Sequence, residues 1–491
     1  MKRLAFILTI ILCFSAYADE KSDFEKFKER SEAKFNKFKT KSDEKFESFR
    51  KKANEKFAKM LKSDWVKFNL NKGKRQEDVT PTPPQPYNDE PIEDNSTPIQ
   101  EVVIPPAPTP QPKPIEPIEE QPQYDEWMAF SFYGNELKVR LGNSHKFSMP
   151  NVSGTVIANT WQTLSSTKYN NVINDCLEIR NKYSLCDWAY LNMLHELANT
   201  FASKGSNEAT MLMAYLYCQS GYKMRLGTHN NKLYMLYASK HSIYNASFYF
   251  IDRTQFYPFS FNGRDLTICQ ASFPNEQPLS LNMNELPKLG NNQSPKRELH
   301  SNRYKEANAT ISVNPYLIDF FKTYPSSEID NNFMTRWAMY ANAPLSDEAK
   351  NTLYPTMKLA IDGVSQLEAA NRILNFVQTA FDYEYDNKVW GEDRAFFADE
   401  TLFYPYSDCE DRSILFSRLI RDLLGLDVVL VYYPGHLATA VHFTTDVRGD
   451  NFTYDGKKFV ICDPTYINAL VGASMSQFRG CRDISVILLD K

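Results

Sequence analysis

Three residues near the C-terminal end of the chain are of the types that nucleophilic catalysis requires. Cys409 lies in the first turn of a predicted apolar helix that extends to residue 424. The unpaired N–H groups and the positive dipole end of a helix start favour a thiolate there. His436 follows a Pro-Gly turn into a predicted strand, and Asp463 lies at the end of a later strand. In such an arrangement the imidazole takes the thiol proton and later returns one to the leaving group, while the carboxylate orients the ring.

Each of these residues also has a simpler interpretation. Cys409 could be a buried structural thiol, although residues 408–412 place four charged side chains around it. His442 competes with His436 as the base, and the turn directly before His436 favours the latter. Asp463 could merely cap the turn at the proline that follows it. The sequence therefore predicts a triad and leaves these alternatives open.

The three motifs resemble the transglutaminase-like superfamily of papain-like thiol enzymes. Its pattern is a cysteine that opens a helix, a histidine that begins a strand and an aspartate in a strand-terminal Asp-Pro-Thr, here Cys409, His436 and Asp463. Ala398-Asp399-Glu400 and the acidic residues around Cys409 also resemble the bacterial transglutaminase-like cysteine proteinases, which are periplasmic. The resemblance covers roughly residues 340–480. It implies an α+β fold with a papain-like core, in which the nucleophile helix packs on an antiparallel sheet.

An acyl-transfer site also needs hydrogen-bond donors for the developing oxyanion. The backbone N–H of Cys409 is the natural first donor, and Gln378 and Trp390 are candidates for the second. In the proteinase branch, acidic residues beside the nucleophile can bind calcium, which implies Asp408 and Glu410 here. Two carboxylates supply fewer than the about six to eight oxygens that calcium takes, so helix capping and pairing with nearby arginines is the alternative. No organic or redox cofactor is implied.

Residues 1–18 have the form of a secretory signal peptide. Lys2 and Arg3 precede an apolar run at residues 4–14, and Ala16-Tyr17-Ala18 supplies a small-x-small cleavage site. The apolar run is too short to span a bilayer, which takes about 20 residues. The sequence therefore predicts export to the periplasm or cell surface, or secretion, from a bacterium with an envelope.

Export permits disulfides, and the predicted mature chain keeps an odd number of cysteines. Both disulfides and buried free thiols are compatible with the sequence, and an odd count leaves at least one thiol unpaired. The nearest pairs in sequence are Cys176 with Cys186 and Cys462 with Cys481. The seven are Cys176, Cys186, Cys218, Cys269, Cys409, Cys462 and Cys481.

Residues 19–72 form a repeat of eleven residues. This segment carries 17 Lys and Arg against 11 Asp and Glu, whereas the rest of the predicted mature chain is acidic. An eleven-residue period fits a nearly straight helix with a narrow aromatic stripe. Such a helix could associate with itself, dock on a partner or lie on an anionic membrane surface. The stripe consists of Phe24, Phe27, Phe35, Phe38, Phe46, Phe49, Phe57 and Met60.

Residues 73–124 are rich in proline. Fourteen of the 27 prolines lie between Pro81 and Pro122, separated by acidic residues and glutamines. Prolines favour the extended polyproline II conformation, which makes a semi-rigid spacer. The sequence therefore predicts a linker between the helical arm and the body.

The body divides into residues 125–325 and 326–491, both with mixed helix and strand patterns. The segment 252–326 is predicted to be rich in loops. Helices are predicted at 187–202, 209–220, 366–380 and 409–424, and strands at 130–139, 247–251, 428–433, 438–444 and 458–462. Helices followed by antiparallel strands indicate an α+β domain.

Residues 125–325 could be a degenerate copy of the catalytic domain. Ser206-Asn207-Glu208 opens an apolar helix much as the segment around Cys409 does. Asn207 would then replace the nucleophile, and His241 could correspond to His436. The alternative is that two short amphipathic helices look alike by coincidence.

Together these features predict an exported thiol enzyme that acts on an amide bond of a protein or peptide through an acyl-enzyme. Hydrolysis is favoured over cross-linking transamidation because no acyl-acceptor site is evident. The competing hypothesis is a non-catalytic envelope protein for binding or assembly, with the arm and linker as its working parts. The net charge of −4 gives no indication of nucleic-acid binding.

Overall fold

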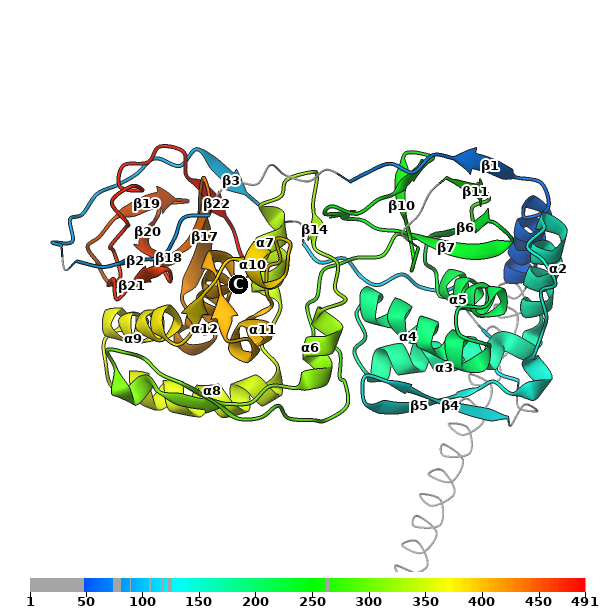
Figure 1. Cartoon of the computed structure of the whole chain (residues 1–491), viewed down its shortest axis with the longest axis horizontal. Helices are drawn as coiled ribbons and strands as arrows, with labels where there is room; N and C mark the ends of the chain where they lie inside the picture. Colours follow the sequence, from blue (N-terminus) through cyan, green and yellow to red (C-terminus); the bar gives the residue numbers. More distant parts are fainter. Residues whose placement is uncertain are drawn as a thin grey trace, which may run out of the picture.

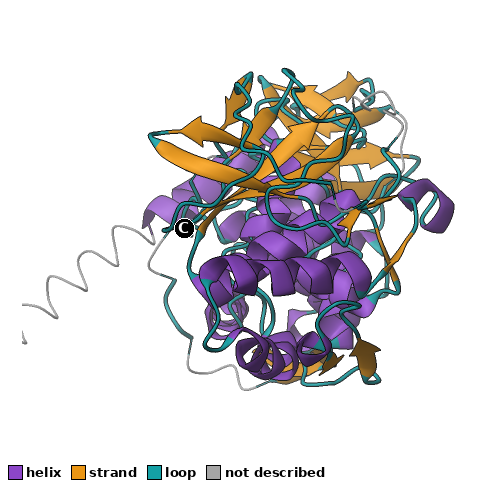
Figure 2. Ribbon diagram, turned by 90° about the vertical axis from the view of Figure 1, so that its left-hand side faces the viewer, coloured by secondary structure: helices purple, strands orange, loops and turns teal. Residues whose placement is uncertain are grey.

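The chain folds into two lobes that lie side by side (Figure 1). The computed structural model describes residues 48–73, 81–88, 90–105, 107–115, 118–121, 126–261 and 265–490. Each lobe has a six-stranded sheet, and the helices of both lobes lie on the same side of the two sheets (Figure 2). The predicted α+β class with antiparallel sheets is confirmed. The predicted signal peptide and residues 19–47 of the arm lie outside the described residues.

The first lobe contains the helices α2 to α6. They are α2 (Gly154–Leu164), α3 (Asn170–Lys182), α4 (Asp187–Phe201), α5 (Asn207–Gln219) and α6 (Pro315–Phe321). Its sheet contains β1 (Trp65–Phe68), β6 (Met224–His229), β7 (Lys232–Ala238), β9 (Tyr249–Ile251), β10 (Thr254–Pro258) and β11 (Leu266–Cys269). The hairpin β4 (Trp127–Phe132) and β5 (Asn135–Arg140) stands apart from this sheet. The pair β12 (Arg297–Leu299) and β13 (Ala309–Ile311) packs on the second lobe, where the Arg297 guanidinium donates to the carbonyls of Leu402 and Phe403.

The second lobe contains the predicted nucleophile helix, α12. Its helices are α7 (Thr335–Asn342), α8 (Asp347–Ile361), α9 (Gln366–Thr379), α10 (Asp386–Val389), α11 (Ala398–Phe403) and α12 (Cys409–Leu424). Its sheet contains β3 (Glu101–Val103), β17 (Asp427–Tyr433), β18 (His436–His442), β19 (Asn451–Tyr454), β20 (Lys457–Cys462) and β22 (Ser485–Ile487). Two-stranded pairs are β2 (Gln85–Pro86) with β21 (Tyr466–Ile467), β15 (Asp382–Tyr383) with β16 (Tyr406–Ser407), and β8 (Ser242–Ile243) with β14 (Ser327–Glu328).

The two sheets have the same strand order. The first is β9-β10-β7-β6-β11-β1 and the second is β19-β20-β18-β17-β22-β3. In each lobe a helix (α5 or α12) precedes two central antiparallel strands, and a strand from the N-terminal region closes one edge. The lobes differ at that edge, because β1 is antiparallel to its neighbour and β3 is parallel. Corresponding positions in the two lobes can therefore be compared.

Most helices begin and end near their predicted positions, and one predicted strand is wrong. The strand expected at 130–139 is the hairpin β4–β5, because Tyr133 and Gly134 both adopt positive φ angles, 41° and 78°. Two such residues make the tight turn that suits a two-residue hairpin. The helices predicted at 187–202, 209–220, 366–380 and 409–424 correspond to α4, α5, α9 and α12.

The predicted helix at 19–72 does not continue to its expected end. Within the described residues the helix runs from 48 to 60, and after a turn the chain forms β1 at the edge of the first sheet. The end of the aromatic stripe packs on the protein's own first lobe, where the Phe57 ring lies 4.6 Å from the Trp161 ring. Asn54 accepts a 2.9 Å hydrogen bond from the Trp161 indole. This part of the stripe is therefore core rather than a free docking surface.

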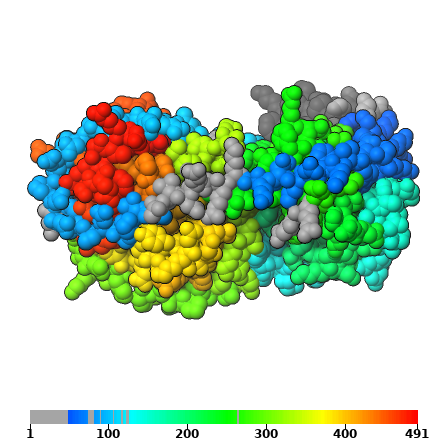
Figure 3. Space-filling model, turned by 45° about the horizontal axis from the view of Figure 1, so that its top comes forward, coloured from blue at the N-terminus to red at the C-terminus, as the bar shows by residue number. Residues whose placement is uncertain are grey.

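The proline-rich segment is not a free spacer either. We call its described residues between 81 and 121 the strap, because they lie along both lobes (Figure 3). Residues 81–105 join the second lobe through β2 and β3, and the Thr82 N–H donates to the Gly435 carbonyl at 2.9 Å. Farther along, Gln111 donates to the Leu185 carbonyl in the first lobe at 2.7 Å. The prolines exclude a helix but not edge-strand pairing, so the strap is part of the fold.

The seven cysteines from 176 to 481 are free thiols, and all but Cys481 are buried. The structure therefore has free thiols rather than disulfides. Neither Cys176 with Cys186 nor Cys462 with Cys481 forms a disulfide. Among the described residues, no helix combines the length and apolar character that a membrane span needs.

Candidate active site

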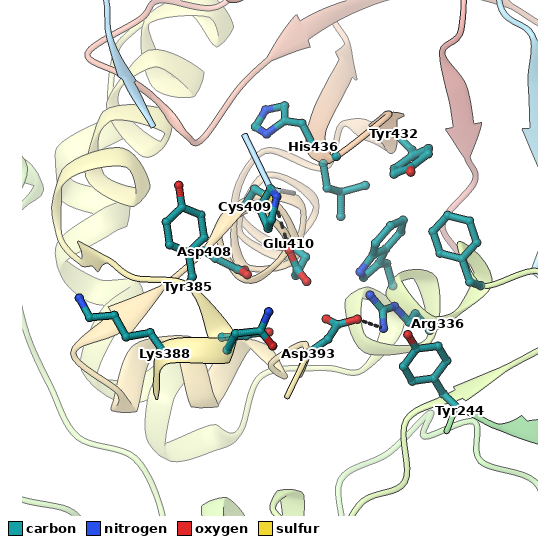
Figure 4. A pocket seen from close by; sticks show the side chains of 17 residues that line it. Tyr244, Arg336, Tyr385, Lys388, Asp393, Asp408, Cys409, Glu410, Tyr432 and His436 are labelled. Atoms are coloured by element: carbon teal, nitrogen blue, oxygen red, sulfur yellow. Dashed lines mark hydrogen bonds and ion pairs between the residues drawn. The ribbon is translucent and has the colours of Figure 1, made fainter. Parts of the chain in front are cut away.

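Cys409 and His436 line one cavity of about 550 Å³ (Figure 4). Its walls come from α7, α10, the start of α12 and the turn between β17 and β18. The first lobe contributes Tyr244, and the strap contributes Pro81. The cavity is therefore assembled from three parts of the chain.

Cys409 is the first residue of α12 and is 4% exposed. The helix start is fixed by Asp411, which accepts hydrogen bonds from the N–H groups of Asp408 and Phe396. The thiol donates to Glu410 Oε2 at 3.2 Å, and its sulfur accepts from the N–H of Leu437. Burial, together with the Glu410 and Asp408 carboxylates, raises the pKa of the Cys409 thiol well above its ordinary value. In this state Cys409 is a neutral thiol.

His436 and Asp463 form a buried pair beside the thiol. His436 Nε2 lies 2.9 Å from Asp463 Oδ2, and both residues are 2% exposed. The imidazole stacks on the Phe478 ring, with centroids 5.0 Å apart and planes 7° apart. His436 Nδ1 has no hydrogen-bond partner among the described residues. A neutral ring that donates through Nε2 to Asp463 keeps its Nδ1 lone pair available for a proton.

The structure thus brings together Cys409, His436 and Asp463, and it separates His442 from them. His442 lies at the opposite end of β18, where its Nδ1 contacts the Lys458 carbonyl at 3.0 Å. It does not line the cavity. Of the two histidines, His436 is the one placed to act on Cys409.

Gln378 and Trp390, the predicted oxyanion donors, do not line the cavity. The Gln378 amide donates to three carbonyls, those of Asp463, Tyr466 and Ala469, at 3.0, 2.7 and 3.2 Å. Trp390 packs against Tyr404 instead, with ring centroids 4.9 Å apart. Gln378 therefore fixes the loop that carries Asp463, and neither side chain can supply the second donor.

Two carboxylates that the sequence did not single out lie near Glu410. Oxygen atoms of Asp386, Asp393 and Glu410 lie within 4.8 Å of one another, and Asp408, Cys409 and Glu410 form a second such group. Burial and the charge of Glu410 raise the pKa of Asp386 to about 8. Asp408 Oδ1 is buried and has no hydrogen-bond partner among the described residues.

These oxygens fit a calcium ion better than the predicted pair alone does. Calcium takes carboxylate oxygens in a flexible geometry and completes its shell with water. Asp386 and Asp393 form a group of three carboxylates with Glu410, and the repulsion among these carboxylates is what a cation would relieve. The acidic residues at 386 and 393 lie in a segment without a periodic pattern, so only the fold reveals them.

The corresponding position in the first lobe holds an amide. Asn207 is the first residue of α5, and its Oδ1 accepts from the Leu233 N–H at 2.9 Å. Lys232 begins β7, as His436 begins β18. His241, the predicted counterpart of His436, follows the end of β7, so that prediction is wrong. At these two positions the first lobe has neither a thiol nor an imidazole.

No family model matches the chain, and no similar curated protein or solved structure was found. The assignment of the site therefore rests on the motifs and on the geometry described above.

Proposed function

We propose that the protein is an exported, transglutaminase-like thiol enzyme with a papain-like core in its second lobe. It hydrolyses an amide bond in a protein or peptide through an acyl-enzyme on Cys409. The observation that carries this proposal is the His436–Asp463 pair, because His436 lines the same cavity as the helix-terminal Cys409 and its Nδ1 has no hydrogen-bond partner among the described residues. Export rests on the signal-like residues 1–18.

In the proposed reaction, His436 Nδ1 takes the Cys409 proton and the thiolate attacks the substrate carbonyl carbon. The C–N bond breaks as the imidazolium protonates the leaving amine, which leaves a thioester on Cys409. A water molecule then gives a proton to His436 and attacks the thioester. The acid product leaves as the proton returns to sulfur. Asp463 stabilises the imidazolium in both steps, and the Cys409 N–H donates to the oxyanion.

Calcium is proposed as a bound ion rather than a participant in these steps. Asp386, Asp393 and Glu410, which form one group of neighbouring carboxylates, would hold it. When bound, it would compensate the carboxylate charge beside the nucleophile.

The test is the alkylation rate of Cys409 by iodoacetamide at pH 7, read by mass spectrometry. Cys481, a free and partly exposed thiol, is the internal reference. We expect Cys409 to react faster than Cys481 in the wild type and to lose about tenfold in rate in His436→Ala. His442→Ala, the matched control, should leave both rates unchanged.

Equal reactivity of the two thiols, or no effect of His436→Ala, would favour the second candidate, a binding or assembly protein with the same fold. The hydrogen bond from the Cys409 thiol to Glu410 is the observation that supports this second candidate. If the thiol is activated, a casein digest with and without a fluorescent primary amine separates hydrolysis from transamidation, since only transamidation incorporates the amine.

A further inference from the structure

Two side chains that line the cavity each carry a buried N–H group without an acceptor. They are Arg336 Nε and Trp337 Nε1, on consecutive residues of α7, and neither has a hydrogen-bond partner among the described residues. Arg336 is 6% exposed and Trp337 is 5% exposed, and both line the cavity that contains Cys409. A buried donor without an acceptor is unfavourable, and two together are unusual in a native structure. A bound molecule with an acceptor oxygen would satisfy both.

The charges around these donors indicate a neutral oxygen rather than a carboxylate. Arg336 Nη1 already forms a 2.7 Å ion pair with Asp393, so its positive charge is compensated. Asp386 and Glu410 lie beside Asp393, and when no calcium is bound their charge would oppose a further anion. A carbonyl oxygen accepts two N–H hydrogen bonds without adding charge.

The donors lie against four aromatic rings, which we call the aromatic wall: Tyr244, Phe333, Trp337 and Tyr432. The Trp337 ring lies 5.4 Å from the Phe333 ring and 5.5 Å from the Tyr432 ring. The Arg336 guanidinium lies 5.1 Å from the Tyr244 ring, and Figure 4 shows these two side chains together on one side of the cavity. Such a surface gains free energy by covering an apolar or aromatic group.

We propose that Arg336 and Trp337 form a subsite that holds a peptide carbonyl oxygen of the substrate, with a bulky apolar side chain against the aromatic wall. This proposal rests on the proposed function. The substrate class is then a peptide with an aromatic or large aliphatic residue next to the bond that Cys409 attacks. Since Tyr244 belongs to the first lobe, that lobe shapes the specificity of the second.

Three iodoacetyl probes test the subsite in the full chain. Each forms an S–C bond to Cys409 with loss of iodide. Iodoacetamide has no group for the subsite, N-iodoacetyl-phenethylamine has the phenyl ring, and N-iodoacetyl-phenylalaninamide has the ring and a second carbonyl. We expect the alkylation rate of Cys409 to rise along this series, with the last probe about tenfold faster than the first.

Trp337→Phe replaces the indole with a smaller aromatic ring and removes the N–H. It should lower the rate of the phenylalaninamide probe about fivefold and that of the phenethylamine probe by a smaller factor. Trp390→Phe is the matched control, because Trp390 lies outside the cavity, and it should change no rate. Tyr244→Ala, an independent variant, should lower the rates of both phenyl probes and spare iodoacetamide.

The outcomes separate the two proposals. If Cys409 reacts readily but equally with all three probes, the subsite is overturned and the thiol enzyme stands. The subsite is likewise overturned, and the thiol enzyme stands, if Trp337→Phe and Tyr244→Ala leave the ratios of the three alkylation rates unchanged. If Cys409 reacts no faster than Cys481 with any probe, the proposed function fails and the subsite fails with it.

Discussion

Asn207 and Cys409 occupy the same position in their two lobes. Each is the first residue of the helix that precedes the two central strands, and each accepts a hydrogen bond from the second residue of the second strand. Asn207 accepts from Leu233, and Cys409 accepts from Leu437. A side chain at this position therefore joins the helix start to the sheet. Only in the second lobe does it also carry a thiol.

The first prediction concerns this link. Asn207→Ala leaves the buried Leu233 N–H without an acceptor and removes the Asn207 hydrogen bond to the Asn231 carbonyl. We expect the free energy of unfolding to fall by about 1–3 kcal/mol in urea titrations. Asn181→Ala, at an exposed position of α3, is the control and should change it by less than about 0.5 kcal/mol. Equal effects of the two changes would contradict the structural role of Asn207.

The second prediction is a pH dependence that comes from His241. Burial lowers the pKa of this histidine to about 4, below the 6.5 of an exposed one. Between these values the unfolded chain binds a proton that the folded chain does not, so the contribution to stability is complete above pH 6.5 and is lost as the pH falls toward 4. The loss amounts to about 3 kcal/mol.

His241→Asn isolates this effect, because an amide oxygen can still accept the hydrogen bond that the Leu281 N–H donates to His241 Nδ1. Urea titrations from pH 4.5 to 8 should show the wild type losing more stability than the variant below pH 6.5. A constant difference across this range would show that His241 does not titrate as described.

The third prediction concerns the strap. Val103 is 4% exposed in β3, whereas the neighbouring Ile104 is 69% exposed. Val103→Ala should lower the free energy of unfolding by about 1–3 kcal/mol because it removes buried apolar contacts. Ile104→Ala should have little effect in the same urea titration. Similar values for both would mean that the strap does not pack on the sheet.

The fourth prediction assigns Gln378 to positioning. Gln378→Ala leaves the carbonyls of Asp463, Tyr466 and Ala469 without their shared donor, so both the stability and the alkylation rate of Cys409 should fall. We expect a loss of about 2 kcal/mol in the free energy of unfolding. Gln366→Ala, which affects only an exposed contact with Thr444, is the control. If the Gln378→Ala variant is destabilised but the alkylation rate of Cys409 is unchanged, Gln378 has only a structural role.

The fifth prediction concerns calcium. Calcium at about 100 times its dissociation constant should raise the free energy of unfolding by about 2.7 kcal/mol. Asp386→Asn should abolish this gain, and Asp319→Asn, at an exposed ion pair in α6, should preserve it. Isothermal titration calorimetry of both variants provides an independent measurement. If the wild type shows no heat of binding, these carboxylates do not bind calcium.

Local signals explain which elements the sequence predicts well. Helix α12 begins after Asp408 and ends at Gly425, whose φ of 64° suits glycine. Helix α5 begins at Ser206, whose hydroxyl accepts from the Ala209 N–H. The proposed triad was predicted from the same signals, since each member lies at the end of a helix or strand. The hairpin at Tyr133 was missed although the sequence marks it, because the apolar positions change from even (Phe130, Phe132) to odd (Leu137, Val139) across Gly134.

Long-range contacts explain what the sequence does not reveal. The eleven-residue repeat continues past the end of the helix. Residues 65–68 do not extend the helix because they pair with the edge of the first sheet. Similarly, proline content predicts an extended chain but does not indicate where that chain lies. Asp393 and Trp337 reach the cavity from segments far from Cys409, and no local pattern connects them.

The strap has a consequence for the order of folding. Glu101 in β3 pairs with Ser485 in β22, so the edge of the second sheet joins segments from opposite ends of the chain. Contacts between such distant segments form slowly because a long loop must close first. Since synthesis proceeds from the N-terminus, the lobe that carries Cys409 is completed only when nearly the whole chain has emerged. We therefore expect chains truncated before β22 to lack a completed second lobe.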